Sequence, residues 1–153
     1  MPDLLSGVVS GIVAGLITGV VLMRYSLFID CKNRVVDALR HAHTHVFVLN
    51  KPADYHEKLT DLHTSVGIIQ ERLFDAGHEQ SAKTLGNMIT HILVLDNTMP
   101  IAANNSLQVA DNFIGWLKCV EKLPLSWWAL LCPIPIAYWK RLVTFVKRDL
   151  PKP

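Results

Sequence analysis

The feature that most constrains this chain is an uninterrupted apolar run near its start. Between Asp3 and Arg24 lie 20 residues, 4–23, without a charged side chain. As a helix this run measures about 30 Å, the thickness of the hydrocarbon core of a bilayer. A secretory signal peptide is the alternative, but it would carry a basic amino-terminal region and a small-x-small cleavage site, and neither flanks the run. The run therefore predicts a transmembrane helix in a first domain, 1–24.

Basic residues lie after this run rather than before it. Arg24, Lys32, Arg34 and Arg40 follow it, whereas only the amino terminus precedes it. Because Lys and Arg favour the cytoplasmic side of a membrane, we expect a single-pass protein with its amino terminus outside and residues 24–153 in the cytoplasm. A bacterial inner membrane suits this arrangement best. The three cysteines, an odd number far apart, form no disulfide framework, which agrees with a reducing compartment.

The same run contains a four-residue repeat of a small residue, a glycine and two apolar residues. The glycines are Gly7, Gly11, Gly15 and Gly19, and the small residues before them are Ser6, Ser10, Ala14 and Thr18. A spacing of four places both sets along one face of a helix, and small side chains let membrane helices approach closely. The repeat resembles the glycine zippers of oligomeric channel and pore-forming proteins, and this resemblance implies assembly more than conduction. We expect self-association through this face, with packing against another membrane protein as the alternative.

Beyond the run, apolar residues recur at the three-and-four spacing of helices. The membrane helix is expected to continue as a stalk to Asn50. Further helices are expected over 54–77, ending at the natural C-cap Gly77, over 79–95, and from the cap Ser106 onward with Leu107, Ala110, Phe113, Ile114, Leu117 and Val120 facing the core. Residues 97–105 have the composition of a loop. The predicted fold class is all-α, with a cytoplasmic antiparallel helical bundle as the second domain, 25–122.

The third domain, 123–153, changes character. Residues 123–139 are apolar and uncharged, prolines interrupt them, and basic residues flank both ends, which opposes a second crossing. We expect an interfacial or re-entrant hairpin followed by a basic amphipathic helix over 136–148. The expected membrane-interface residues are Trp127, Trp128, Tyr138, Trp139, Lys140, Arg141, Lys147 and Arg148, with Trp116 as a further aromatic of this type. The alternative is that these aromatic residues form the core of the bundle.

Histidines provide the only cluster suited to metal chemistry: His41, His43 and His45. On a helix only His41 and His45 align, and two ligands are an incomplete set for zinc. No Glu-x-x-His or His-Glu-x-x-His spacing completes it. We expect no metal and no cofactor, and surface or partly packed histidines at these positions. If the pair has a role, proton sensing is as plausible as metal binding.

Other chemistry has little support in the sequence. Cys31, beside the membrane run, is a candidate for palmitoylation, although a small buried apolar residue is the simpler expectation. All clustered glycines lie inside the membrane run, so there is no phosphate-binding loop. A net charge of +2 excludes a polyanion binder that depends on many phosphate contacts.

These features predict a non-catalytic scaffold, sensor or subunit of a membrane complex, whose partners are membrane lipid and further copies of the chain but not nucleic acid. The main alternative is a pore-forming or membrane-disrupting effector of the phage or bacterial toxin type, with the zipper helices lining a channel. A metal-dependent helical enzyme that uses His41 and His45 is the second alternative.

Overall fold

The computed structural model describes residues 2–49, 52–102 and 106–131, and every regular element among them is a helix. The helices are α1 (Pro2–Leu49), α2 (Pro52–Asp75), α3 (Glu79–Ala102), α4 (Ser106–Glu121) and α5 (Trp127–Leu131). The prediction of an all-α chain with one long apolar amino-terminal helix is confirmed for this part of the protein.

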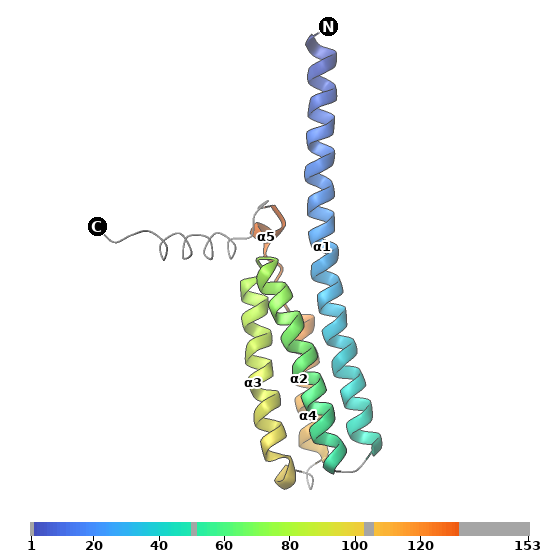
Figure 1. Ribbon diagram of the computed structural model, residues 1–153, viewed down its shortest axis with the longest axis vertical. Helices are drawn as coiled ribbons and strands as arrows, with labels where there is room; N and C mark the ends of the chain where they lie inside the picture. Colours follow the sequence, from blue (N-terminus) through green and yellow to red (C-terminus); the bar gives the residue numbers. More distant parts are fainter. Residues whose placement is uncertain (1, 50–51, 103–105, 132–153) are drawn as a thin grey trace, which may run out of the picture.

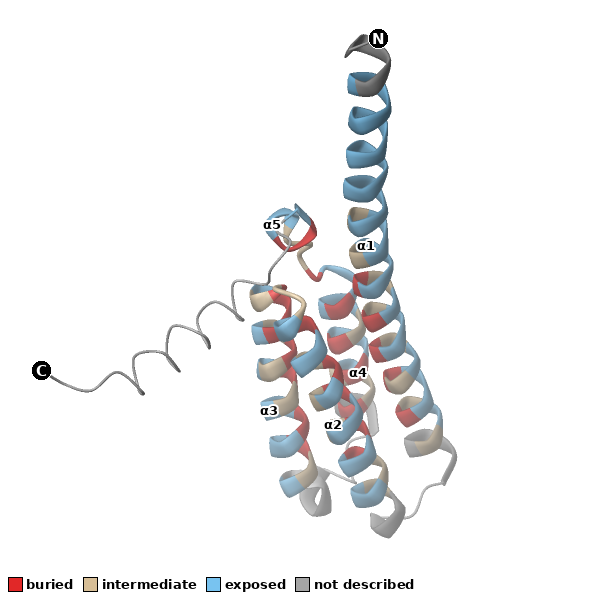
Figure 2. Ribbon diagram, turned by 45° about the horizontal axis from the view of Figure 1, so that its top comes forward, coloured by how far each residue is buried: buried red, intermediate tan, exposed pale blue. Residues whose placement is uncertain are grey.

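Helix α1 has two halves with opposite surroundings. Its first half projects beyond the other helices (Figure 1), and residues 6–20 are all exposed. Its second half presents a buried stripe that begins at Phe28 and Cys31 and continues to Ala42 (Figure 2). No proline interrupts the chain between Pro2 and Pro52, so one helix spans both environments. The predicted stalk is confirmed, and it ends at Leu49.

Four helices pack into a closed arrangement below the projecting part of α1. Helix α1 contacts α2 and α4, and α3 contacts the same two helices. Neighbouring helices run in opposite directions (Figure 1). Their core contains Val35, Leu39, Val66, Leu85 and Phe113, each at most 1% exposed. The spacing of these residues on their own helices gives each helix one apolar stripe, and burial of the four stripes against one another holds the helices together.

Helix α3 extends further than the sequence predicts. The expected loop at 97–105 is wrong over its first six residues, because α3 continues through Pro100 to Ala102. Ile92 and Leu95 stay in the core, and this packing overrides the weak helix propensity of the residues that follow. A proline in the last turn removes only one helical hydrogen bond. Helix α2 similarly starts at Pro52, two residues earlier than expected, since a proline is tolerated in a first turn.

Helix α4 places two residues on the opposite side from the prediction. Trp116 is 8% exposed and contacts the ring of Phe113 edge to face at 5.0 Å, so it is a core residue and its assignment to the membrane interface is wrong. Ile114 is 46% exposed and does not face the core. The buried stripe of α4 passes instead through Val109, Phe113, Trp116 and Val120, and Ile114 lies one residue off this stripe.

The turn between α2 and α3 is short and closely specified. Gly77 has a φ of 87°, a left-handed conformation that glycine adopts without steric cost. The Gly77 amide donates to the carbonyl of Phe74 at 3.0 Å, and the His78 amide donates to that of Leu73 at 2.8 Å. These two bonds form a Schellman motif and confirm Gly77 as the C-cap. The carbonyl of His78 then accepts from the amide of Ala82 at 2.9 Å, so the same residue caps the start of α3.

Candidate functional site

The glycine repeat of α1 has no packing partner within the described chain. A Cβ added at Gly7, Gly11, Gly15 or Gly19 would meet nothing within 4 Å. The accompanying small residues, Ser6, Ser10, Ala14 and Thr18, are exposed as well. An 18-residue window of this helix has a mean hydropathy of 2.1, and none of it is buried. The projecting half of α1 is therefore long and apolar enough to cross a membrane, and its small-residue face is open to lipid or to another helix.

A second feature lies where α1 enters the bundle. Residues 124–131, which we call the α5 arm, follow α4 and include α5. The guanidinium of Arg24 donates from Nη1 to the carbonyl of Ala129 at 2.8 Å. The hydroxyl of Ser81 donates to the carbonyl of Pro124 at 2.6 Å. Because Arg24 directly follows the uncharged run, the α5 arm is held at the level where that run ends.

The α5 arm buries one face and exposes its largest side chains. Ala129 and Leu130 are buried, whereas Trp127, Trp128 and Leu131 are 69%, 75% and 61% exposed. Tryptophan has an apolar body and a polar N–H, a combination that favours the interface between a bilayer and water. Tyr138, Trp139, Lys140, Arg141, Lys147 and Arg148, the other expected interface residues, lie outside the described residues.

A buried histidine contacts the α5 arm, and the sequence did not predict this contact. His78 is 1% exposed, and its ring lies against that of Phe28 with centroids 4.7 Å apart. Its Nδ1 accepts a hydrogen bond from the backbone amide of Ser126 at 3.3 Å, and Ser126 Oγ accepts from the amide of Ala129 at 3.3 Å. Since Nδ1 is an acceptor, the neutral ring carries its proton on Nε2.

The Nε2 atom of His78 has no hydrogen-bond partner among the described residues. A buried N–H without an acceptor costs about 1–3 kcal/mol. Burial and the nearby Arg24 cation both lower the pKa of His78 from its ordinary value of 6.5. The imidazole is thus neutral at physiological pH, with one nitrogen holding the α5 arm and the other unsatisfied.

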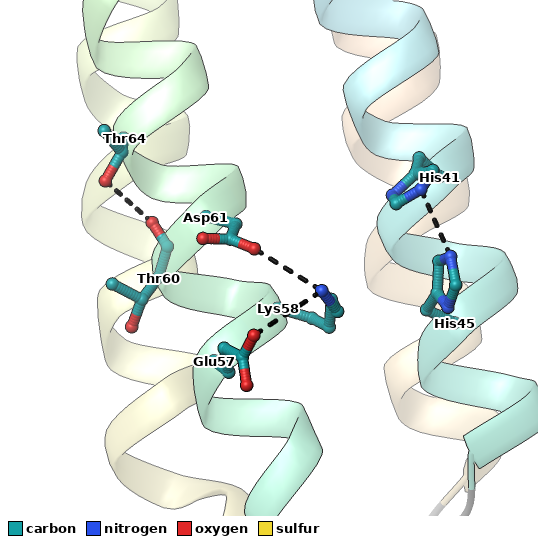
Figure 3. A network of polar contacts seen from close by, with 7 residues as sticks. All are labelled: His41, His45, Glu57, Lys58, Thr60, Asp61 and Thr64. Atoms are coloured by element: carbon teal, nitrogen blue, oxygen red, sulfur yellow. Dashed lines mark hydrogen bonds and ion pairs between the residues drawn. The ribbon is translucent and has the colours of Figure 1, made fainter.

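The paired histidines of α1 face each other as their spacing predicts. The Nε2 atoms of His41 and His45 are 3.1 Å apart on an exposed surface (Figure 3). His43 does not join this pair, because its ring packs edge to face against that of Phe113, with the ring centroids 5.5 Å apart. Two nitrogens bound at 2.0–2.1 Å to one metal ion would be about 2.8–3.4 Å apart for bond angles between 90° and 109°. The pair therefore has the spacing of a bidentate chelate, although no group of three or more His, Cys, Asp or Glu in the described part of the chain could hold a metal.

The cysteines differ in accessibility. Cys31 is 1% exposed, and burial, with a smaller effect of Asp30, raises the pKa of its thiol. Both properties make it a core residue and a poor site for acylation. Cys119 on α4 is exposed, and Cys132 lies outside the described residues.

Beside α2 and α3 lies an open groove of about 480 Å³. It is lined by residues of both helices: His63, Gly67, Gln70, Glu71, Phe74, Asp75 and Ile89.

Comparison of the chain with protein-family models, with curated proteins and with solved structures gives no match. The two features best suited to a function are the open helix face of α1 and the α5 arm beside the end of the apolar run.

Proposed function

We propose that this protein is a membrane-anchored, self-associating helical protein that acts as a non-catalytic scaffold, sensor or subunit of a membrane complex. The observation that carries the proposal is that α1 leaves the bundle as an apolar helix with no part of its apolar window buried (Figure 1). A core helix of a water-soluble protein with similar hydropathy would be mostly covered. Exposure of this much apolar surface requires lipid or another helix as its cover.

The continuity of α1 favours a retained anchor over a cleaved leader. Val35 and Leu39 belong to the same helix and are fully buried in the core. Cleavage close after the apolar run would free the end of a helix that forms one side of the bundle. We therefore infer a single transmembrane segment at 4–23 with the bundle beside the membrane, as domains 1–24 and 25–122. The amino terminus is proposed to lie outside a bacterial inner membrane and the bundle in the cytoplasm, in accordance with the basic residues after the run.

The α5 arm is proposed to rest on the same bilayer. Its two exposed tryptophans lie on a segment that Arg24 holds beside the end of the membrane run. Lipid headgroups and interfacial water satisfy the mixed polarity of tryptophan better than bulk water does. On this proposal α1 anchors the bundle, and the α5 arm sets its position against the membrane surface within the third domain, 123–153.

Self-association is tested by the oligomeric mass of the full chain in a mild detergent. We expect a defined oligomer for the native protein and a monomer for Gly11→Leu combined with Gly15→Leu, because bulky side chains prevent close approach of the helix backbones. Val9→Leu combined with Val13→Leu adds bulk to the opposite face of the same helix and is expected to leave the oligomer intact. A monomeric native protein, or an oligomer that survives the glycine replacements, would refute assembly through this face.

The resemblance of the repeat to glycine zippers keeps a pore-forming or membrane-disrupting protein as the alternative function. Release of a trapped dye from liposomes distinguishes the two functions, since a scaffold leaves the vesicles sealed. Dye release by the native chain that is lost in the glycine double variant would establish the pore and overturn the scaffold.

A further inference from the structure

Hydrogen bonds to three other segments help to attach the α5 arm to the bundle. Its backbone accepts from Arg24 and from Ser81, and the Ser126 amide donates to His78. These three partners belong to α1, to α3 and to the turn that starts α3. Residues 124–131 contain no ionisable side chain. Main-chain hydrogen bonds and the buried side chains of Ala129 and Leu130 therefore hold the arm, and its two tryptophans are left for a different contact.

Of these three contacts, only the one to His78 depends on an ionisation near neutral pH. The neutral imidazole accepts the Ser126 N–H through the lone pair of Nδ1. When a proton from water binds to that lone pair, the ring has N–H groups at both nitrogens and no acceptor. The N–H at Nδ1 of His78 then faces the amide N–H of Ser126, and the hydrogen bond between them is lost. The protonated ring also becomes a buried cation close to the Arg24 guanidinium.

The charged surroundings of His78 oppose its protonation while the arm is attached. Arg24 on α1 is the charged group that lowers its pKa, in addition to burial. Asp75 at the end of α2 and Glu79 at the start of α3 are the ionisable residues nearest along the chain, and neither contributes to the shift. From the α5 arm no charge faces the ring, because that segment has none. Proton binding is therefore coupled to detachment, which returns the imidazole to water.

We propose that the α5 arm is a detachable lipid-binding element, latched to the bundle by neutral His78 and released when His78 is protonated. The inference rests on the proposed contact between the arm and the bilayer and adds its regulation. The attached state is fully favoured above the ordinary pKa of histidine, 6.5, and weakens as the pH falls from there toward the lower pKa of the attached state. Within that window the equilibrium shifts by up to about tenfold per pH unit.

The partner proposed for the released arm is the lipid surface rather than a second protein. Trp127, Trp128 and Leu131 are exposed together on one short helix, and Arg24 ties that helix to the point where the uncharged run of α1 ends. A released arm stays next to the membrane that α1 crosses. Deeper entry of the tryptophans into the interface offsets the loss of the contacts with the bundle.

The test measures detachment and lipid contact separately on the full chain. Hydrogen exchange of the Ser126 and Ala129 amides in detergent micelles reports detachment between about pH 8 and about pH 5. His78→Gln supplies an acceptor that does not titrate, and comparison at equal pH removes the intrinsic pH dependence of exchange. We expect exchange in the native chain to increase severalfold relative to His78→Gln below pH 6.5. His91→Gln, an exposed histidine of α3, should behave as the native chain. Equal pH dependence in the native chain and His78→Gln would overturn the latch.

Lipid contact is measured in vesicles of brominated phosphatidylcholine and phosphatidylglycerol. Quenching by the brominated chains, taken as the difference between the native protein and Trp127→Phe combined with Trp128→Phe, reports the two exposed tryptophans. We expect this quenching to increase as the pH falls. Quenching that is constant with pH would refute the latch and support the bilayer contact. Acid-dependent exchange with no quenching at any pH would support the latch and refute the bilayer contact.

A second variant keeps the latch testable if His78→Gln does not fold, which circular dichroism would reveal. Arg24→Gln removes the cation that opposes protonation of His78 and retains an amide donor for the Ala129 carbonyl. Without this cation the pKa of attached His78 lies closer to its ordinary value, so protonation favours detachment less. The ratio of exchange at pH 5 to exchange at pH 8 is therefore expected to be smaller in Arg24→Gln than in the native chain. A ratio as large as that of the native chain, or larger, would overturn the proposal.

Discussion

Replacement of Leu39 by alanine tests whether the second half of α1 contributes to the core of the bundle and to its stability. Leu39 is fully buried in the core cluster. The substitution removes three carbon groups, whose burial is worth about 0.8 kcal/mol each, or about 2.4 kcal/mol together. Incomplete collapse of the resulting cavity adds to this loss, so we expect a decrease of about 3–4 kcal/mol in the free energy of unfolding.

The matched control lies on the same helix. Leu16 is 65% exposed and touches only the surroundings of the helix, so Leu16→Ala should change the free energy of unfolding by less than about 0.5 kcal/mol. The assay is equilibrium unfolding by urea in a non-ionic detergent, followed by near-ultraviolet circular dichroism. Trp116 is packed against Phe113 in the core, so its signal depends on an intact core. A loss below about 1 kcal/mol for Leu39→Ala, or equal losses for the two variants, would refute the role of α1 as a bundle helix.

Three further predictions concern the turn, the cysteines and the histidine pair. Gly77→Ala places a Cβ at a φ of 87°, so urea unfolding should show a loss of about 1–2 kcal/mol, and an unchanged midpoint would contradict the left-handed cap. With Cys132 replaced by serine, a membrane-impermeant maleimide should label the exposed Cys119 only after the cells are permeabilised. Buried Cys31, whose thiol pKa is raised, should stay unlabelled in the folded protein. Labelling of Cys119 in intact cells would reverse the proposed topology. The facing nitrogens of His41 and His45 predict that Ni²⁺ raises the thermal midpoint of the native chain but not of His45→Ala, and equal shifts would exclude the chelate.

The helices and several of their ends could be predicted from the sequence, because residues close together in the chain determine them. The continuous α1, the cap at Gly77 and the start of α4 at Ser106 were predicted from an uncharged run, a glycine and a serine at helix ends. The errors arose where distant packing prevailed. Helix α3 continues past Leu95 through a proline, and the stripe of α4 selects Trp116 over Ile114.

In the candidate site, too, the sequence predicted what depends on neighbouring residues and missed what depends on distant contacts. Trp127 and Trp128 are exposed, and their assignment to a membrane interface stays a prediction. The alignment of His41 with His45 follows from their spacing. The role of His78 was not predicted, because it depends on a hydrogen bond with Ser126, 48 residues away. The bond between Arg24 and the Ala129 carbonyl spans 105 residues, and no local pattern predicts such a contact.

The sequence by itself determined that the chain is helical, that one helix is long and apolar enough to cross a membrane, and that its glycines share one face. These properties depend on hydrophobicity and on helical periodicity, which act over a few residues. Only the tertiary structure decided which aromatic residues are buried, where the α5 arm is held and which histidine loses its access to water. Those outcomes depend on contacts between residues far apart in the chain, whose formation requires all four helices to pack at once.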